Sequence, residues 1–135
     1  MLPLISNTKY RVTYADTDQM GVVYYGNYGR LYEIGRTEMI REIGLPYAEL
    51  EKEGIMMPVY SVEAKYKNVL KYDELVTIET TVKDMPSARI EFFYRIFNGA
   101  GELAHVAKAV LVFKDMATNK VVRAPEKLLK AIQTM

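Results

Sequence analysis

The chain has 135 residues, of which 50% are hydrophobic and 26% charged, and its formal net charge is +1. These values predict one soluble domain, residues 1–135, around one core, and they give no reason to expect a nucleic acid or an anionic membrane as partner. The absence of cysteine excludes disulfides, thiolate zinc sites and a cysteine nucleophile.

The first ten residues, MLPLISNTKY, carry no basic stretch followed by a long apolar run, so we do not expect a signal peptide. No apolar run approaches the roughly 20 residues that span a bilayer, and a cytoplasmic protein is therefore expected. Residues 9–14 alternate, with Tyr10, Val12 and Tyr14 on one face, which predicts a half-buried strand.

Residues 14–43 begin as a polar loop with Asp16 and Asp18 and continue as a helix. Apolar residues recur on one helix face: Tyr28, Leu31, Tyr32, Gly35, Met39, Ile40 and Ile43. Charged residues occupy the opposite positions: Arg30, Glu33, Arg36, Glu38, Arg41 and Glu42. Asn27 is the expected N-cap and Gly44 the expected stop. Acidic side chains thus lie beside a helix N-terminus, whose unpaired N–H groups carry partial positive charge.

The rest of the chain forms shorter segments. Residues 46–53 predict a second, short helix. Four segments with the two-residue period of strands follow, separated by turns: residues 60–67, 75–83, 89–97 and 102–114. After a turn and a short extension at residues 121–122, residues 124–132 predict a terminal helix with Pro125 in its first turn.

Strands that follow one another through short turns pair antiparallel, and one face of such a sheet has to be covered. Because residues 28–43 form the only long apolar helix, we expect an α+β fold in which a curled sheet of about five strands wraps around it. The other face of the sheet and its edge strands remain uncovered, so a homodimer or homotetramer is expected.

Elimination leaves carboxylates as the candidate catalytic groups. The three serines, Ser6, Ser61 and Ser87, lie outside any G-x-S-x-G motif. The single histidine, His105, lies within a predicted strand, where we expect a structural role. No G-x-x-x-x-G-K-[ST] or G-x-G-x-x-G motif for binding phosphates occurs.

Asp16 and Asp18 allow several interpretations. A calcium loop fails, because its fifth position is Met20 and its twelfth is Asn27. A D-x-D magnesium site lacks a third carboxylate nearby in the sequence. A structural turn, in which the aspartates bond their own backbone, stays open.

The longer string D-x-D-x-x-G-V-V-Y-Y-x-N-Y, followed by a helix with the sequence R-T-E-M, resembles the acyl-CoA thioesterases of the 4-hydroxybenzoyl-CoA thioesterase family. The resemblance covers nearly the whole chain, including D-E-L-V-T-I-E-T at 73–80. It implies the hotdog fold, a curled antiparallel sheet around one long helix, and hydrolysis of acyl-CoA to the free acid and coenzyme A.

The resemblance places the catalytic carboxylate at Asp18 and the oxyanion donor at the backbone N–H of Tyr25. Asp18 would attack the thioester carbonyl or activate a water molecule, and both mechanisms stay open. Asp16 is then expected to shape the loop. No metal and no cofactor is implied, because coenzyme A is part of the substrate.

Substrate binding needs an acyl pocket and a basic patch for phosphates. Glu33 matches a family position at which an acid contacts the acyl part, and Tyr24, Tyr25 and Tyr28 are candidates to line the pocket. The candidates for the phosphates and the pantetheine arm are Lys65, Lys67, Ser87 and Arg89. The better-known members carry a basic cluster just before the strand at 89–97, where this chain has Met-Pro-Ser-Ala.

Three functions therefore compete: an acyl-CoA thioesterase, a thioesterase acting on acyl carrier protein, and a non-catalytic acyl-CoA-binding or scaffold module. The acyl group stays open among aromatic, short-chain and long-chain acids.

Overall fold

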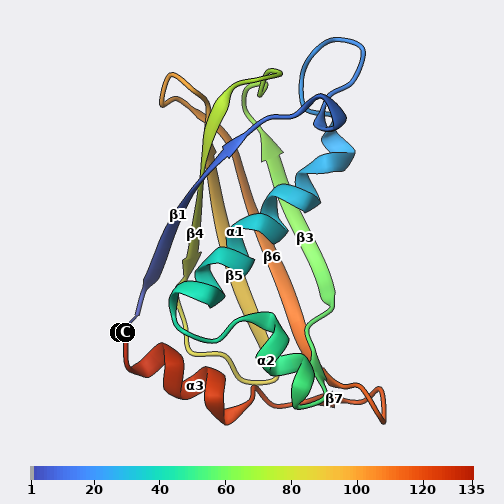
Figure 1. The fold of residues 1–135 in the computed structure, drawn as a ribbon, viewed down its shortest axis with the longest axis vertical. Helices are drawn as coiled ribbons and strands as arrows, with labels where there is room; N and C mark the ends of the chain where they lie inside the picture. Colours follow the sequence, from blue (N-terminus) through green and yellow to red (C-terminus); the bar gives the residue numbers. More distant parts are fainter. Residues whose placement is uncertain (1) are drawn as a thin grey trace.

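A computed structural model describes residues 2–135. Its helices are α1 (Tyr28–Glu42), α2 (Tyr47–Lys52) and α3 (Glu126–Gln133). Its strands are β1 (Leu4–Arg11), β2 (Ile55–Met56), β3 (Val59–Tyr66), β4 (Leu75–Val82), β5 (Arg89–Phe97), β6 (Leu103–Asp115) and β7 (Val121–Val122). Figure 1 shows α1 lying diagonally across the sheet.

The five long strands lie side by side in the order β1–β4–β5–β6–β3, each antiparallel to its neighbour. The predicted α+β hotdog architecture is confirmed. The predicted number of about five strands is wrong, since the sheet has seven. The two additional strands, β2 and β7, have two residues each and pair with the C-terminal part of β6. Two residues are too few to show an alternating pattern in the sequence.

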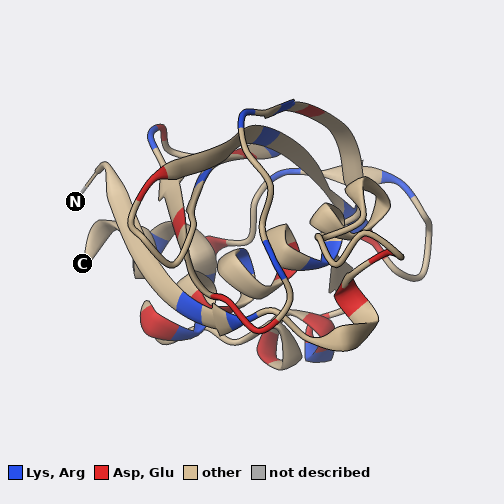
Figure 2. Ribbon diagram, turned by 90° about the horizontal axis from the view of Figure 1, so that it is seen from above, with Lys and Arg blue, Asp and Glu red and all other residues tan. Residues whose placement is uncertain are grey.

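The sheet curves around α1, and Figure 2 shows basic and acidic residues mixed over the surface. The inner face of β4 is buried as predicted, at Val76, Ile78, Thr80 and Val82. Gly35 allows α1 to approach this strand closely, because a Cβ at residue 35 would lie 2.4 Å from Thr80 Oγ1 and 2.8 Å from Ile78 Cγ2. The helix thus lies where a side chain would not fit.

The edge of the sheet formed by β3 is less well covered by α1. The main contacts of α1 with the long strands are with β1 and β4. On β3, the side chains of Tyr60, Val62 and Tyr66 are 72%, 47% and 53% exposed. The strand β3 therefore combines an unpaired edge with an uncovered apolar face.

Both ends of the first strand differ from prediction. The first strand is β1, Leu4–Arg11, rather than residues 9–14, and it is followed by a 3₁₀ turn at Tyr14–Asp16. Ser6 is buried on the inner face of β1, and this polar residue interrupts the apolar alternation. The predicted stop of α1 is confirmed, since Gly44 has a φ of 86° and its N–H donates to Arg41 O at 2.9 Å. None of the helices within residues 2–135 has the length and apolar character needed to cross a membrane.

Candidate active site

The loop between β1 and α1 is held against the segment that precedes β4. Val23 N donates to Leu70 O at 2.8 Å, and Tyr72 N donates to Gly21 O at 2.9 Å. Thr17 and Val23 form an antiparallel bridge across the loop. The two limbs of the loop are therefore fixed side by side before the chain enters α1.

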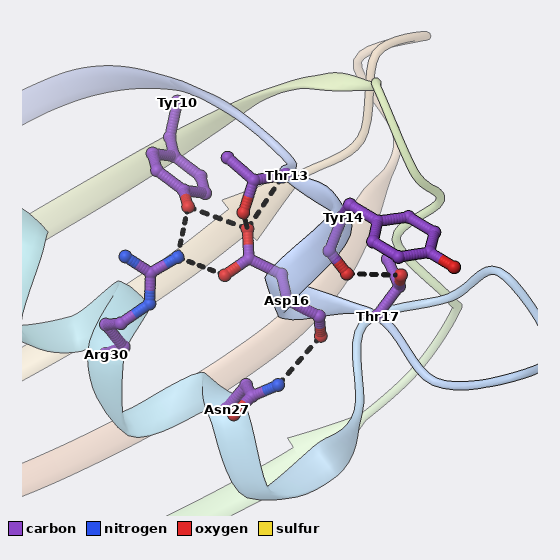
Figure 3. Close-up of polar contacts among 7 residues, drawn as sticks. All are labelled: Tyr10, Thr13, Tyr14, Asp16, Thr17, Asn27 and Arg30. Atoms are coloured by element: carbon purple, nitrogen blue, oxygen red, sulfur yellow. Dashed lines mark hydrogen bonds and ion pairs between the residues drawn. The ribbon is translucent and has the colours of Figure 1, made fainter.

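Asp16 ties this loop to both of its neighbours (Figure 3). Its carboxylate, 1% exposed, accepts hydrogen bonds from Tyr10 Oη at 2.6 Å, from Thr13 N at 2.7 Å and from Thr13 Oγ1 at 2.9 Å, and it forms an ion pair with Arg30. Burial alone would raise the pKa of Asp16, but the hydrogen bonds from Tyr10, Arg30 and Thr13 outweigh it and hold the pKa below its ordinary value. Asp16 is thus an ionised, fully engaged group that joins β1, the loop and α1.

The backbone of Asp16 orders the start of the helix. Asp16 O accepts from Tyr24 N at 3.0 Å and from Asn27 Nδ2 at 2.8 Å. Asn27 occupies the predicted N-cap position of α1, but its side chain makes no capping hydrogen bond. It binds the loop instead, so its side chain leaves the first N–H groups unoccupied.

The backbone N–H of Tyr25 lies at the start of the 3₁₀ turn Tyr25–Asn27, which leads into α1. Within residues 2–135, this N–H donates to no protein acceptor. The first N–H groups of a helix lack partners within it and carry partial positive charge. This donor is therefore free to bind an oxygen atom of a ligand.

Asp18 lies in the tight turn at the tip of the loop and is exposed. Its Oδ1 accepts from Met20 N at 2.9 Å, and its backbone O accepts from Gly21 N at 3.0 Å. The structural turn that the sequence allows is therefore formed. The other carboxylate oxygen, Oδ2, makes no hydrogen bond to any described residue. In Asp16, by contrast, both carboxylate oxygens have partners. The bridge between Thr17 and Val23 links the two limbs of the loop. Asp18 is the residue after Thr17, and Tyr25 lies two residues after Val23.

The three candidate tyrosines have different surroundings. Tyr24 and Tyr25 are exposed, with ring centroids 4.7 Å apart. Tyr28 is buried, where it stacks on His105 at 4.2 Å and meets the edge of Tyr66 at 5.1 Å. Burial raises the pKa of Tyr28 to about 12. Tyr28 therefore belongs to an aromatic cluster between α1 and the sheet, and the other two rings lie on the surface.

His105 is at the centre of this cluster. It is fully buried in β6, and its Nε2 hydrogen-bonds the hydroxyl of Tyr32, whereas Nδ1 has no partner within residues 2–135. Burial lowers the pKa of His105 to about 4, so the imidazole is neutral at neutral pH. Its contacts are those of a core residue.

Glu33 lies at the junction of two cavities of about 390 Å³ each on α1. One follows the outer side of the helix and is lined by Arg30, Glu33, Ile34, Thr37 and Glu38. The other lies between α1, α2 and β2 and is lined by Glu33, Arg36, Thr37, Tyr47, Glu51, Ile55, Met56 and Met57.

Arg36 was predicted on the charged outer face of the helix, and this is wrong, because it is only 9% exposed. Arg36 lies four residues after Tyr32 and three before Met39, and this helical spacing places it beside the buried face. The spacing could have indicated its burial. Charge alone suggested the solvent side, but α2 packs over this position and covers it.

The four residues predicted to bind coenzyme A form two separate groups. Lys65 pairs with Val106 on β6, and Arg89 pairs with Val112. These positions on β6 are six residues apart, which is about 20 Å along a strand. Ser87 lines a cavity of about 160 Å³ together with Arg89, whereas Lys67 follows Tyr66 at the opposite end of the sheet. One chain therefore does not bring the two groups together.

Comparison with known proteins identifies relatives over most of the chain. Residues 12–132 match the model of the thioesterase-like superfamily. The chain is 35% identical to YneP of Bacillus subtilis over 119 residues, which cover 88% of this chain and 86% of YneP. It is 30% identical to the acyl-CoA thioester hydrolase YbgC of Escherichia coli, with 88% and 89% covered. The solved structure of a DHNA-CoA thioesterase from Staphylococcus aureus superimposes with a TM-score of 0.91 at 34% identity, over 96% of this chain and 89% of that one.

Proposed function

The chain belongs to the thioesterase-like superfamily and is a thioester hydrolase, and from this premise we propose that Asp18 and the Tyr25 N–H hydrolyse acyl-CoA. The observation that carries the assignment is the contrast between the two aspartates. Asp16 accepts from Tyr10, Thr13 and Arg30, so none of its lone pairs points to an open site. Asp18 is exposed and has one oxygen without a protein partner.

The Tyr25 N–H supplies the second requirement of acyl transfer. The thioester oxygen gains negative charge as its carbonyl carbon is attacked, and a donor at a helix N-terminus stabilises that charge. The hydrogen bonds of the Asp16 backbone to Tyr24 and Asn27 hold this donor in place before substrate binds. Preorganisation of this kind avoids reordering the loop during the reaction.

Two routes are compatible with these positions. In the nucleophilic route, an Asp18 oxygen bonds to the carbonyl carbon, the C–S bond breaks, and the thiolate leaves; water then hydrolyses the mixed anhydride. In the general-base route, Asp18 takes a proton from water, the resulting hydroxide adds to the carbonyl, and the thiolate leaves and is protonated. A single turnover in ¹⁸O water that labels Asp18 and gives unlabelled acid establishes the nucleophilic route, because water has then attacked the Asp18 carbonyl of the anhydride and the bridging Asp18 oxygen leaves with the product.

We test the carboxylate with Asp18→Asn. The expected result is a loss of kcat/KM of about 10²–10⁴-fold, with an unchanged circular dichroism spectrum. The matched control is Asp73→Asn, at an exposed aspartate with a φ of 67°, a conformation that asparagine adopts readily. Turnover by Asp18→Asn at the rate of the parent would rule out the assignment.

The oxyanion donor can be removed by Tyr25→Pro, since proline has no N–H and is well tolerated in the first turn of a helix. Tyr24, at φ −65° and ψ 134°, already has the extended conformation required before proline. We expect a loss of about 10²–10³-fold in kcat. Tyr25→Ala, which removes the ring but keeps the N–H, is the control and should retain most of the activity.

The functional unit is proposed to be a homodimer formed through β3. Tyr60, Val62 and Tyr66 support this, because they leave an apolar surface beside an unpaired strand edge. Two-fold pairing of β3 edges would bring Lys65 and Lys67 of one subunit toward Arg89 of the partner subunit and so unite the two basic groups. Sedimentation of the parent and of Val62→Lys tests this: the parent should be dimeric and the variant monomeric.

Coenzyme A is the proposed carrier, and acyl carrier protein is the alternative. Equal acyl groups on both carriers should react faster on coenzyme A; the reverse order would assign the carrier protein. Saturable binding without hydrolysis would instead indicate a binding module. A hydroxylated aromatic acyl group is proposed, because the Staphylococcus aureus relative is named a DHNA-CoA thioesterase and a Synechocystis structure of the same fold is named a 1,4-dihydroxy-2-naphthoyl-CoA thioesterase.

A further inference from the structure

Arg36 is a buried cation without an anionic partner. It is 9% exposed, its Nε has no hydrogen-bond partner, and no carboxylate within residues 2–135 lies at ion-pair distance from it. Removing a charge from water without providing acceptors is costly. The position is therefore suited to a ligand that supplies an acceptor.

The neighbours of the guanidinium do not fill this role. Tyr94 of β5 and Tyr47 of α2 lie beside it, with hydroxyls close enough to interact with the guanidinium. Burial raises the pKa of Tyr94 to about 12, so this phenol is neutral. Arg36 thus has only neutral neighbours, and its Nε donor has no partner among the described residues.

Arg36 lines the cavity between α1, α2 and β2, which has a volume of about 390 Å³. Ile55, Met56 and Met57 provide an apolar wall, and the polar groups lie on the helix side. This combination is typical of a small-molecule site, in which apolar surface supplies affinity and a few polar groups fix orientation.

The cavity adjoins the second cavity, which follows α1 toward its N-terminal end. It shares Glu33 and Thr37 with the groove along α1, whose other end is lined by Arg30, the partner of Asp16. Tyr25 lies eleven residues before Arg36, which corresponds to about 16 Å at 1.5 Å per residue, and the arginine side chain covers part of this distance. An acyl group whose thioester binds at Tyr25 therefore has to be extended, as a bicyclic aromatic group is, to bring its distal end to Arg36 along α1.

We propose that Arg36 is a specificity-determining residue, which donates hydrogen bonds to an uncharged oxygen, a hydroxyl or carbonyl, at the distal end of the acyl group. This inference rests on the proposed acyl-CoA hydrolase function. A distal carboxylate is disfavoured because Glu33 and Glu51 line the same cavity and would repel it. A hydroxyl fits both kinds of group, since it accepts from the guanidinium and donates to a carboxylate.

The experiment compares matched bicyclic aromatic acyl-CoA substrates that carry a distal hydroxyl, a distal carboxylate or no substituent. The parent is expected to prefer the hydroxylated substrate by at least tenfold in kcat/KM. Arg36→Met, which keeps the length of the side chain but removes its donors, should abolish this preference while turnover of the unsubstituted substrate changes little. Arg41→Met is the matched control, at an exposed arginine of the same helix, and should keep the preference.

Binding of the free product acids, measured by calorimetry, provides a readout besides activity. The hydroxylated acid should bind more weakly to Arg36→Met than to the parent, whereas the unsubstituted acid should bind equally. If Arg36→Met does not fold, Arg36→Lys carries the test, because it keeps the charge but loses the Nε donor and the fork geometry.

Several results would overturn the inference: no preference in the parent, a preference for the carboxylated substrate, or an equal loss on all substrates in Arg36→Met, which would indicate a structural role. If the parent hydrolyses no acyl-CoA, the proposed function fails separately. The calorimetric comparison then still decides whether Arg36 recognises the hydroxyl.

Discussion

Replacement of Gly35 by alanine tests how closely the central helix approaches the sheet. A Cβ at this position would lie 2.4 Å from Thr80 Oγ1, 2.8 Å from Ile78 Cγ2 and 3.6 Å from Tyr94 Cε1. Thr80 and Ile78 are buried in a central strand, so neither can move aside without shifting the backbone. Forced overpacking of this kind costs about 1–3 kcal/mol.

Alanine is the better helix former by about 1 kcal/mol, and this gain opposes the clash. We therefore expect Gly35→Ala to lower the free energy of unfolding by up to about 2 kcal/mol, and the midpoint of thermal unfolding by up to about 8 °C. The control is Gly29→Ala in the same helix, where a Cβ would meet nothing within 4 Å. It should leave stability unchanged or raise it.

The chain contains no tryptophan, so urea unfolding is followed by circular dichroism. The double variant Gly35→Ala/Thr80→Ala should show a favourable coupling of at least about 0.5 kcal/mol, because the closest contact is removed. If Gly35→Ala and Gly29→Ala have the same sign and size, the close approach of α1 to β4 is refuted.

Two titrations give further predictions. The pKa of His105 in the folded protein is about 4, below its ordinary value of 6.5. As the pH falls, the unfolded state therefore binds a proton before the folded state does. The free energy of unfolding should fall between about pH 6.5 and pH 4, by up to about 1.4 kcal/mol per pH unit. Urea midpoints across this range should show a smaller slope in His105→Gln, and an unchanged slope would contradict the burial argument. For Asp16, the lowered pKa means that its stabilisation is present above the ordinary carboxyl pKa and is lost as the pH falls through the folded value. Asp16→Asn should therefore lower the free energy of unfolding by about 1–3 kcal/mol at pH 7 and by almost nothing in strong acid. The rate of hydrolysis should also fall, because the loop loses its ion pair with Arg30. A variant as stable and as active as the parent would show that these contacts of Asp16 are dispensable.

Local sequence patterns identified the helices and strands that are long enough to show a clear apolar period. The helix at 28–42 has an apolar face with helical spacing and a glycine stop, and β5 alternates from Arg89 to Phe97, so both were located closely. The strand β2 could not be found, because two residues have no period, and β7 was indicated only as a short extension at residues 121–122. β1 was placed too late, because Ser6 is polar but buried.

The candidate site shows the same division. The resemblance predicts Asp18 and the Tyr25 N–H as the catalytic groups and Asp16 as a loop residue, and these roles stay predictions. The folded chain gives the two aspartates different surroundings, because Tyr10, Thr13 and Arg30 come from three different parts of the chain and converge on Asp16.

What the sequence by itself determined was the order of strands and helices and the family motif, since periodicity and turn residues act between near neighbours in the chain. What only the tertiary structure decided was burial at single positions. Arg36 carries a charge that is typical of surface residues, and it is buried without an anionic partner because α2 packs over it. Likewise, Lys65 and Arg89 were grouped by charge, and strand register placed them at opposite ends of the sheet. Register and helix packing depend on contacts between distant segments, which no local pattern encodes.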